Sequence, residues 1–355
     1  MVKIETVRGS ISPDELGVTL PHEHVLIDLA ATHITPATSA RGAALLDSPV
    51  SMKILGELRR SFTLSKDNLK LSDVDAAIEE LRLFSEAGGR SLVDVTPSYS
   101  APATRSPDVM REISEKAEVN IVVGTGFYVQ ASHPRIVQEN SVRELCQLMV
   151  RDLSEGFEGS QIRAGMIGEL GCGVPIDSDE EKVLRAAALA QGETRACIII
   201  HSGTFDPFSR TIAKEANSYL DILEAEGADL TRVCVGHMDF TSSDLKYQEQ
   251  ILNRGAFIAY DTFGCEFYRD DLWIGATYPT DTQRVAGIVE LCKKGYDGQL
   301  LLSQDTCIKM QTVAYGGYGY AHILQHIVPC LRQSGVGSAQ IHNMLIDNPK
   351  KLLQI

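Results

Sequence analysis

The chain has 355 residues and a formal net charge of -14, a length that suits one of the larger single-domain α/β proteins. The negative charge argues against nucleic acid or an anionic membrane as the partner, because both are bound chiefly through clustered Lys and Arg. No apolar stretch approaches the roughly 20 residues that span a bilayer, and the N-terminus lacks the apolar segment of a signal peptide. The eight cysteines form no Cys-x-x-Cys pair, so we expect reduced thiols and a cytoplasmic location.

Eight short runs rich in β-branched residues predict strands, and each is followed by a segment with helical periodicity. We expect the strands at residues 17–22, 91–96, 120–126, 164–171, 197–202, 232–237, 256–261 and 299–303. We expect the helices at residues 72–87, 106–117, 141–155, 178–191, 215–226, 242–253, 281–293 and 320–332. Several helices open with a Ser or Asp that can cap free amides, and the near-continuous apolar strands indicate a parallel sheet buried on both faces.

Two segments fall outside this alternation of strands and helices. Residues 30–70 contain Pro36 and Pro49 before a helix-like stretch at 52–61, and they predict either a lid or substrate wall or a plain surface excursion. Residues 338–347 predict a last helix that ends at Asn348-Pro349 and has no catalytic role. No composition change marks a boundary, so we treat residues 1–355 as one domain.

Residues of the kind that bind divalent metals stand at the carboxyl ends of five predicted strands: His22, His24, Glu169, His201, His237 and Asp305. Neutral imidazole suits zinc and manganese, and a carboxylate can bridge two cations. His22 and His24 are two apart on a strand, so they point to the same side while Glu23 points away. A single histidine after an apolar run is usually a core residue, but five such strand ends in one chain indicate a metal site.

The distribution of these residues distinguishes between two possible folds for eight βα units. An open, doubly wound sheet is the rival, but only a closed ring brings the ends of the first, fourth, fifth, sixth and eighth strands together. We therefore predict a (β/α)8 TIM barrel with a binuclear metal centre at the carboxyl ends of its strands. Two such ions would lower the pKa of a shared water toward about 7, which predicts a hydrolase.

Two further residues are candidates for the chemistry of this site. Asp305 can contact both a metal and the water that attacks, so we predict that it accepts and donates the proton; the alternative is a plain metal ligand. Tyr128, after the third strand, could place its phenol near the reacting atoms or pack against the first loop. The other histidines are expected to be structural, although the spacing of His322 and His326 can bind zinc: His33, His133, His322, His326 and His342.

Short motifs along the whole chain resemble those of a known family, at residues 6–9, 15–17, 19–24, 126–128, 167–172 and 315–323. The first three look like the opening signature of the phosphotriesterase family in the amidohydrolase superfamily, and the others resemble its phosphotriesterase-related branch. The resemblance implies a (β/α)8 barrel with two metal ions, often zinc. By this match His22, His24 and Asp305 resemble ligands of the more buried ion, His201 and His237 those of the more exposed ion, and Glu169 the bridge.

The chain departs from the phosphotriesterases of that family at the bridging position. There the fourth strand supplies a carboxylated lysine, whereas this chain has Glu169, which offers a similar negatively charged pair of oxygens. The related branch shares this glutamate, and the change argues against efficient organophosphate hydrolysis. Asp239-Phe240 also stands where organophosphate hydrolases carry further acidic residues, so we do not transfer their proton relay to this chain.

The resembled branch includes hydrolases of N-acyl amino-sulfonates, chiefly N-acetyltaurine, while nearby branches act on lactones or phosphoesters. A sulfonate needs a cation, for which Lys309 is the first candidate and Lys66 and Arg60 are alternatives, although a solvated side chain is the commoner role for any one of them. Trp273 is either a wall of the substrate pocket or a surface anchor.

We therefore expect a metal-dependent amidohydrolase that cleaves a small N-acylated anion, such as N-acetyltaurine, to acetate and taurine. Its partner would be this small molecule, with no nucleic acid and no membrane, and a homodimer is a candidate assembly. A lactonase or phosphoesterase is the rival within the superfamily. A non-catalytic binding protein for small ligands is the rival of another class, and the six filled ligand positions argue against it.

Overall fold

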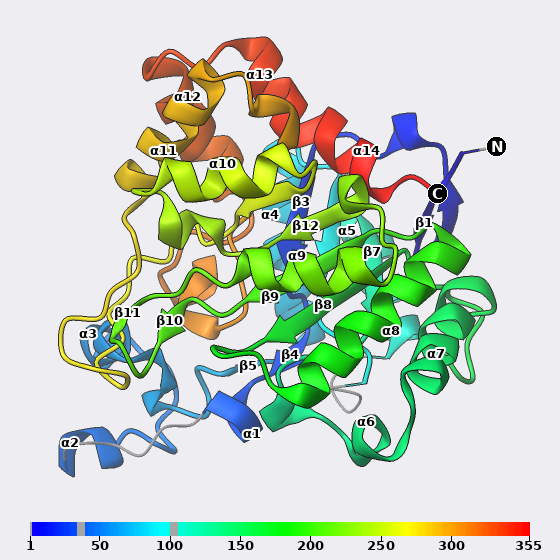
Figure 1. The fold of residues 1–355 in the computed structure, drawn as a ribbon. Coiled ribbons are helices and arrows are strands. Elements are labelled where there is room, and N and C mark those ends of the chain that lie inside the picture. The colour runs from blue at the N-terminus through cyan, green and yellow to red at the C-terminus, as the bar shows by residue number, and fades with distance from the viewer. Residues whose placement is uncertain (1, 34–39, 100–105) are drawn as a thin grey trace.

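The computed structural model of the protein describes residues 2–33, 40–99 and 106–355. Eight parallel strands form a nearly closed barrel with helices around it, as predicted (Figure 1). From one edge to the other the strands are β3 Thr19–Glu23, β6 Ser91–Asp94, β7 Asn120–Thr125, β8 Met166–Cys172, β9 Ile198–Ser202, β12 Val233–Val235, β13 Phe257–Tyr260 and β14 Leu300–Leu302.

The first and last strands meet through single hydrogen bonds instead of a regular ladder. The backbone N–H of His22 donates to Ser303 Oγ over 3.1 Å, and that of Asp305 donates to the His22 carbonyl over 3.3 Å. These bonds close the barrel at the carboxyl end, where the predicted metal ligands stand. The (β/α)8 prediction is confirmed, and the open doubly wound sheet is excluded.

The helices that cover the barrel follow the predicted positions closely: α4 Val74–Glu86, α5 Pro107–Ala117, α7 Val142–Ser154, α8 Ser178–Thr194, α9 Ala216–Ala225, α10 Leu245–Asn253, α11 Asp281–Lys293 and, after a π-helical turn at Ile323–Ile327, α12 Val328–Gln333. Side chains cap several of them as expected. Asp73 Oδ1 accepts from the Ala76 amide at the start of α4, and Ser141 with Glu144 forms a reciprocal capping box at the start of α7.

The apolar side chains of the strands form two layers, one inside the barrel and one between the strands and the helices. In β9, Ile198 and Ile200 belong to the outer cluster, whereas Ile199 belongs to the cluster inside the barrel. Because side chains alternate along a strand, His201 points to the same side as Ile199 and enters the barrel mouth. The alternation therefore places a polar ligand directly above an apolar interior.

The C-terminal helix is longer than the sequence predicted. Helix α13 Ser338–His342 continues through a π-helical turn, Asn343–Asp347, into α14 Asn348–Leu353, so the prediction that Pro349 ends the helix is wrong. Proline is tolerated in the first turn of a helical segment, where its missing N–H is not needed. A π-helical turn also precedes Pro329 in α12, so the chain accommodates proline in the same way twice.

Long loops cover the carboxyl end of the barrel. The first loop contains β4 Ile27–Asp28, α1 Ala30–His33, α2 Ala40–Ala43, α3 Leu55–Arg60 and β5 Lys70–Leu71; Pro36 lies outside the described residues. Its apolar side chains, among them Leu58 and Phe62, form one cluster with Phe267 and Met310 from the loops after β13 and β14. The first loop is therefore a packed wall of the barrel mouth, not a plain surface excursion.

The remaining elements are short. They are the hairpin of β1 Ile4–Thr6 with β2 Gly9–Ile11, the hairpin of β10 Phe205–Asp206 with β11 Thr211–Ile212, and α6 Arg135–Glu139. The two chain ends pair at the amino end of the barrel, where the amide of Lys3 donates to the Ile355 carbonyl over 3.0 Å (Figure 1). Among the helices of the described residues, none has the length and apolar character needed to cross a bilayer.

Candidate metal centre

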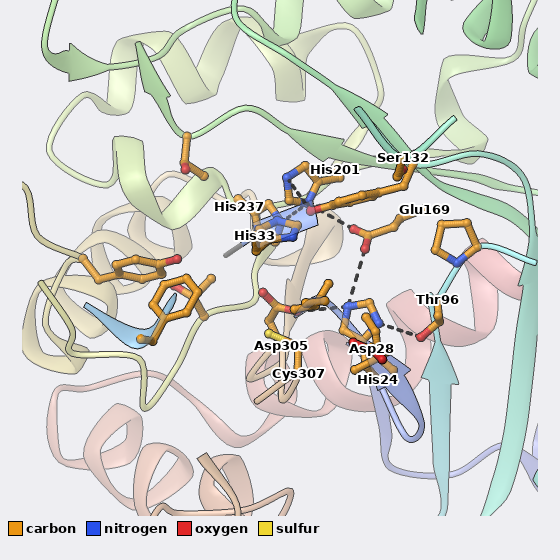
Figure 2. Close-up of a pocket in the computed structure, with 18 of the residues that line it drawn as sticks. His24, Asp28, His33, Thr96, Ser132, Glu169, His201, His237, Asp305 and Cys307 are labelled. Carbon is orange, nitrogen blue, oxygen red and sulfur yellow. Dashed lines mark hydrogen bonds and ion pairs between the residues drawn. The ribbon is translucent and has the colours of Figure 1, made fainter. Parts of the chain in front are cut away.

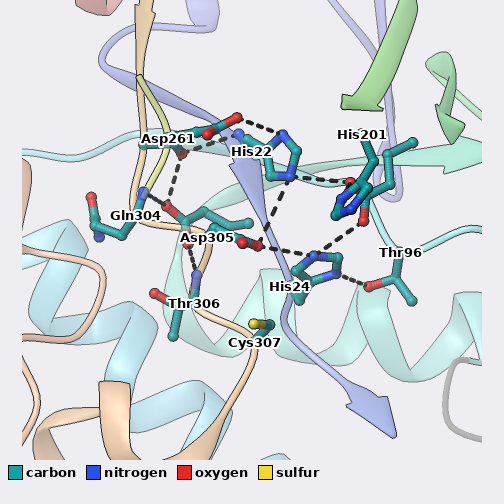
Figure 3. Close-up of polar contacts among 12 residues, drawn as sticks. His22, His24, Thr96, His201, Asp261, Gln304, Asp305, Thr306 and Cys307 are labelled. Carbon is teal, nitrogen blue, oxygen red and sulfur yellow. Dashed lines mark hydrogen bonds and ion pairs between the residues drawn. The ribbon is translucent and has the colours of Figure 1, made fainter. Parts of the chain in front are cut away.

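All six predicted metal ligands lie together at the carboxyl end of the barrel (Figures 2 and 3). With one ligand atom from each residue, three sets have all their atoms within 4.8 Å of one another: His22, His24 and Asp305; Glu169, His201 and His237; and a third in which His22 and His237 meet Asp261. The first set comes from β3 and the segment after β14, and the second comes from β8, β9 and the segment after β12. The first two sets divide the six residues between two positions, with Glu169 in the second, and the assignment of each residue to an ion stays a prediction.

Glu169 lies between the two sets and contacts both. Its Oε1 is 3.5 Å from His24 Nε2, and its Oε2 is 3.3 Å from both His22 Nε2 and His201 Nδ1. Figure 2 shows the carboxylate between His24 and His201. A carboxylate whose two oxygens together reach histidines of both sets is placed to bridge two cations.

The backbone that delivers these ligands is held in conformations that most residues avoid. Gly168, just before Glu169, has φ of 128°, and a Cβ on it would lie 2.3 Å from the Ile199 carbonyl oxygen. His237 and Asp305 adopt left-handed φ values of 57° and 52°. Non-glycine residues in that region are uncommon and cluster at functional sites, where the surrounding structure enforces them.

Three of the histidines are oriented by oxygen atoms behind them. Asp261 Oδ1 lies 2.9 Å from His237 Nδ1, and its Oδ2 lies 3.1 Å from His22 Nδ1. Thr96 Oγ1 lies 2.7 Å from His24 Nδ1. At His237 and His24 an Nδ1–H that donates to these oxygens would leave Nε2 free to bind a metal, whereas His22 Nδ1 makes an ion-pair contact with Asp261.

Sequence reasoning missed both of these orienting residues. Asp261 follows the apolar strand β13 directly, in the same position relative to its strand as the predicted ligands, and this signal could have identified it. Thr96 offers no such signal, because a threonine at the end of a strand is common for its packing alone. Both side chains are fully buried.

Glu23 points away from the site, as the strand alternation predicted, and supports it from behind. Its carboxylate accepts hydrogen bonds from Ser303 Oγ and from the amides of Gln304 and Thr306, at 2.8, 2.7 and 2.7 Å. Burial raises the pKa of Glu23 to about 7, although these three bonds oppose the rise. The contacts fix the backbone on both sides of Asp305 (Figure 3).

The two carboxylates of the site are held in the ionised form. Burial alone would raise the pKa of Glu169, but His201 and His22 outweigh it and keep that pKa well below its usual range. In the same way His24 opposes the effect of burial on Asp305 and lowers its pKa to about 2. Both side chains are therefore anionic ligands at neutral pH.

The pKa values of His22 and His237 are raised by nearby carboxylates, whereas burial and His237 lower the pKa of His201. Burial lowers the pKa of His22, but Asp261 and Glu169 raise it to about 10 overall. Burial likewise opposes Asp261 at His237, whose pKa rises to about 9. The carboxylates thus make this end of the barrel favourable for positive charge, as a cation site requires.

The donor atoms that remain unsatisfied fit a metal. His22 Nε2 and Glu169 Oε2 are buried and make no hydrogen bond within the described part of the chain, although they face each other at 3.3 Å. Unsatisfied buried polar atoms are costly, and a divalent ion would satisfy both. Imidazole nitrogen and carboxylate oxygen are also the donors that zinc and manganese prefer.

The comparisons with known proteins agree with this geometry. The model of the phosphotriesterase family matches residues 2–353. The chain belongs to the phosphotriesterase family. Because that family is hydrolytic and metal-dependent, and the described residues include the matching ligand groups, the protein is a metal-dependent hydrolase.

Individual relatives of this family cover nearly the whole chain. It is 33% identical to the N-acetyltaurine hydrolase of Salmo salar, over 99% of this chain and 97% of that protein. A solved resiniferatoxin-binding protein from Rhodobacter sphaeroides is 35% identical with a TM-score of 0.93, over 99% of this chain and 94% of the other. A phosphotriesterase-like lactonase variant from Deinococcus radiodurans is 27% identical with a TM-score of 0.74, over 99% of both chains.

A cavity of about 170 Å³ opens onto the ligands. Besides the metal-type residues its wall includes Phe62, Tyr128, Phe240, Arg269 and Tyr278 (Figure 2 shows the site with most of the wall). The volume is below the roughly 300–1,000 Å³ of pockets for drug-sized ligands, so the cavity suits a small substrate.

Tyr128 lies in this wall beside the more exposed ligand. Its hydroxyl is 3.2 Å from His201 Nε2, and the two rings meet edge to face with centroids 4.7 Å apart. Burial raises the pKa of Tyr128 well above its ordinary value, so the phenol stays protonated and can donate a hydrogen bond into the cavity.

The four residues predicted to contact substrate lie outside the cavity wall. Lys309 Nζ is 2.6 Å from Asp67 Oδ1, and Lys66 Nζ is 2.8 Å from Asp47 Oδ1. Arg60 contacts Asp270 at 2.6 Å. Trp273 packs edge to face on Phe205, with ring centroids 5.4 Å apart, and is half-buried.

Asp239 and two of the remaining histidines have defined surroundings. Asp239 is fully buried and accepts from Arg284 Nε over 2.7 Å, so it belongs to an ion pair behind the site and not to a proton relay. Among the histidines expected to be structural, His322 contacts Asp281 at 2.7 Å, whereas His33 lines the cavity.

Proposed function

We propose that this protein hydrolyses a small N-acylated anion, of which N-acetyltaurine is the leading example, to a carboxylic acid and an amine. The observation that carries the proposal is the position of Glu169 between two sets of metal-type ligands, beside a small cavity. The N-acetyltaurine hydrolase of Salmo salar, similar over 99% of this chain, supports the choice of substrate.

The donor set favours two divalent ions, with zinc as the first choice. His22, His24 and Asp305 would hold one ion, His201 and His237 the other, and Glu169 both. Bound in this way, the ions would supply Lewis acidity and lower the pKa of water from 15.7 toward about 7.

The chain's own groups would manage the protons of the reaction. Asp305 has a side chain that is 19% exposed, compared with 3% for Glu169, so of the two acidic ligands it is the one that reaches the cavity. Its carboxylate would accept a proton from the attacking water and pass it to the nitrogen of the amide as the C–N bond breaks. The Tyr128 phenol would donate a hydrogen bond to an oxygen of the substrate.

Lactone hydrolysis is the second candidate, supported by the lactonase from Deinococcus radiodurans with a TM-score of 0.74. The same donor set can polarise an ester carbonyl, so the metal centre does not separate the two reactions. The charge in the cavity wall favours the amide, because a neutral lactone cannot form an ion pair with a basic side chain there, whereas an anionic amide can.

A substrate panel on the metal-loaded protein tests the proposal. N-acetyltaurine, other N-acyl amino acids, lactones and paraoxon-like triesters are compared by kcat/KM. We expect N-acetyltaurine to exceed lactones and triesters by orders of magnitude. A higher kcat/KM for lactones would reject the amide assignment in favour of the second candidate.

A further inference from the structure

The loop after β13 brings one basic side chain to the cavity. Of the lysines and arginines in residues 2–33, 40–99 and 106–355, only Arg269 lines this cavity. It shares the wall with the ligand His237 and with Phe62 and Tyr278. Its side chain is 15% exposed, so it is largely shielded from bulk water and faces the cavity.

Several contacts hold Arg269 in a fixed position. Its Nε lies 3.0 Å from Asp271 Oδ1 and its Nη2 lies 2.7 Å from Oδ2 of the same carboxylate, which is 2% exposed. Its amide donates to the Ala276 carbonyl over 2.8 Å, and its guanidinium lies over the Phe62 ring at 5.0 Å. Asp271 thus occupies the edge formed by Nε and Nη2, so the remaining N–H groups of the guanidinium are shared between Tyr278 and any acid group that enters the cavity.

The electrostatic setting keeps this guanidinium charged. Burial lowers the pKa of Arg269, but its hydrogen bonds with Asp271 and Tyr278 outweigh it and raise the pKa overall. A planar, permanently charged group held by a carboxylate on one edge is well suited to bind a second acid group on the other.

We propose that Arg269 binds the acid group of the substrate, a sulfonate or a carboxylate, while the acyl group lies at the metal centre. This inference rests on the proposed function, because it assumes an anionic substrate. It moves the substrate cation from the loops that carry Lys309, Lys66 and Arg60 to the loop after β13. Arg269 would then set the preference for anionic over neutral amides.

The test compares three amides of the same chain length: N-acetyltaurine with a sulfonate, N-acetyl-β-alanine with a carboxylate and N-acetylethanolamine with a neutral hydroxyl. Arg269→Met should raise KM for the preferred anion roughly 10- to 100-fold, the scale of a lost hydrogen bond to a charged group. Its kcat should change little, since the contact is the same in the ground and transition states. The neutral amide should keep its KM.

A second variant guards against damage to the fold. Arg269→Met leaves the buried Asp271 without its partner, so the double variant Arg269→Met/Asp271→Asn removes both charges together. Arg185→Met is the matched control, because Arg185 is also paired with acidic residues, Glu181 and Glu226, but on the outer helices. Equal losses for the anionic and neutral amides in both Arg269 variants would overturn the proposal, as would a larger rise in KM from Lys309→Met.

Calorimetry with 1-propanesulfonate on the metal-loaded protein separates this proposal from the proposed function, because binding needs no turnover. Binding that disappears in both Arg269 variants supports the anion site even if no amide is hydrolysed. Hydrolysis of N-acetyltaurine with unchanged KM and unchanged sulfonate binding in the variants would refute the role of Arg269 while the proposed function stands. Absence of sulfonate binding to the unmodified protein would also refute it.

Discussion

The carboxyl ends of the barrel strands and the loops above them build the two halves of the site in different ways. Glu169 and His201 belong to β8 and β9, and the other ligands stand at strand ends or within a few residues of them. Arg269 lies eight residues beyond Asp261, the residue that follows β13, and reaches the cavity through contacts with Asp271 and Phe62. The strand half is fixed by local periodicity and barrel closure, whereas the loop half is fixed by tertiary packing.

This difference explains why a sequence pattern is informative for chemistry and much less so for substrate recognition. Once the barrel closes, the position of a side chain at the end of a parallel strand is largely determined. A basic residue in a long loop can pair with a neighbouring acid and leave the site, as Lys309 does with Asp67 at 2.6 Å. Substitutions in the two halves should therefore change different kinetic parameters.

The largest effect is expected at the bridging position. Glu169→Gln removes a charge and weakens one donor in a site that would carry about four positive charges, so metal occupancy and turnover should both collapse. Metal analysis and kcat/KM measure this, with the exposed Glu224→Gln as control. Glu169→Lys should fail as well, because the cavity is shaped for a shorter side chain. A Glu169→Gln protein with full metal content and normal turnover would place the bridge elsewhere.

A somewhat smaller effect is expected at the proton-transferring ligand. Asp305→Asn should lower kcat at least roughly 10²-fold, the usual scale for a lost general acid or base, and should change KM little. Steady-state kinetics on protein with measured metal content separates lost chemistry from lost metal. If kcat changes less than about tenfold at full occupancy, Asp305 is only a ligand.

The sequence predicted the barrel and the six candidate ligands, because each of these ligands lies in a regular strand or near its end. Asp261 directly follows β13, so the same pattern covers it, but the pattern does not tell a carboxylate that orients histidines from one that binds a metal. The sequence missed Arg269 because its position depends on how residues 261–280 pack on the first loop. The cytoplasmic location, the homodimer and the absence of nucleic-acid partners stay predictions.

A substitution at Asp261 tests whether the residues behind the ligands contribute to metal binding. Asp261→Asn should weaken metal affinity about 10- to 100-fold, because the acceptor that orients His237 and His22 loses its charge. Competition with a metal-binding dye measures the affinity, and the surface Asp221→Asn serves as control. Unchanged affinity would show that the rings are oriented by packing alone.

Thr96 should give the smallest effect of the series. Thr96→Val removes the hydrogen bond, at 2.7 Å, to His24 Nδ1 while keeping the shape of the side chain. The loss of one such bond corresponds to about 1 kcal/mol, so metal affinity should fall by less than about tenfold. A loss as large as that of Asp261→Asn would mean that His24 depends on this hydroxyl alone for its orientation.

The most direct test of the account is metal analysis of the purified protein joined to the assay of N-acetyltaurine hydrolysis before and after chelation. The account predicts close to two divalent ions per chain, loss of activity on stripping and recovery when zinc or manganese is returned. A protein with no bound metal that hydrolyses N-acetyltaurine equally well in the presence of a chelator would contradict it.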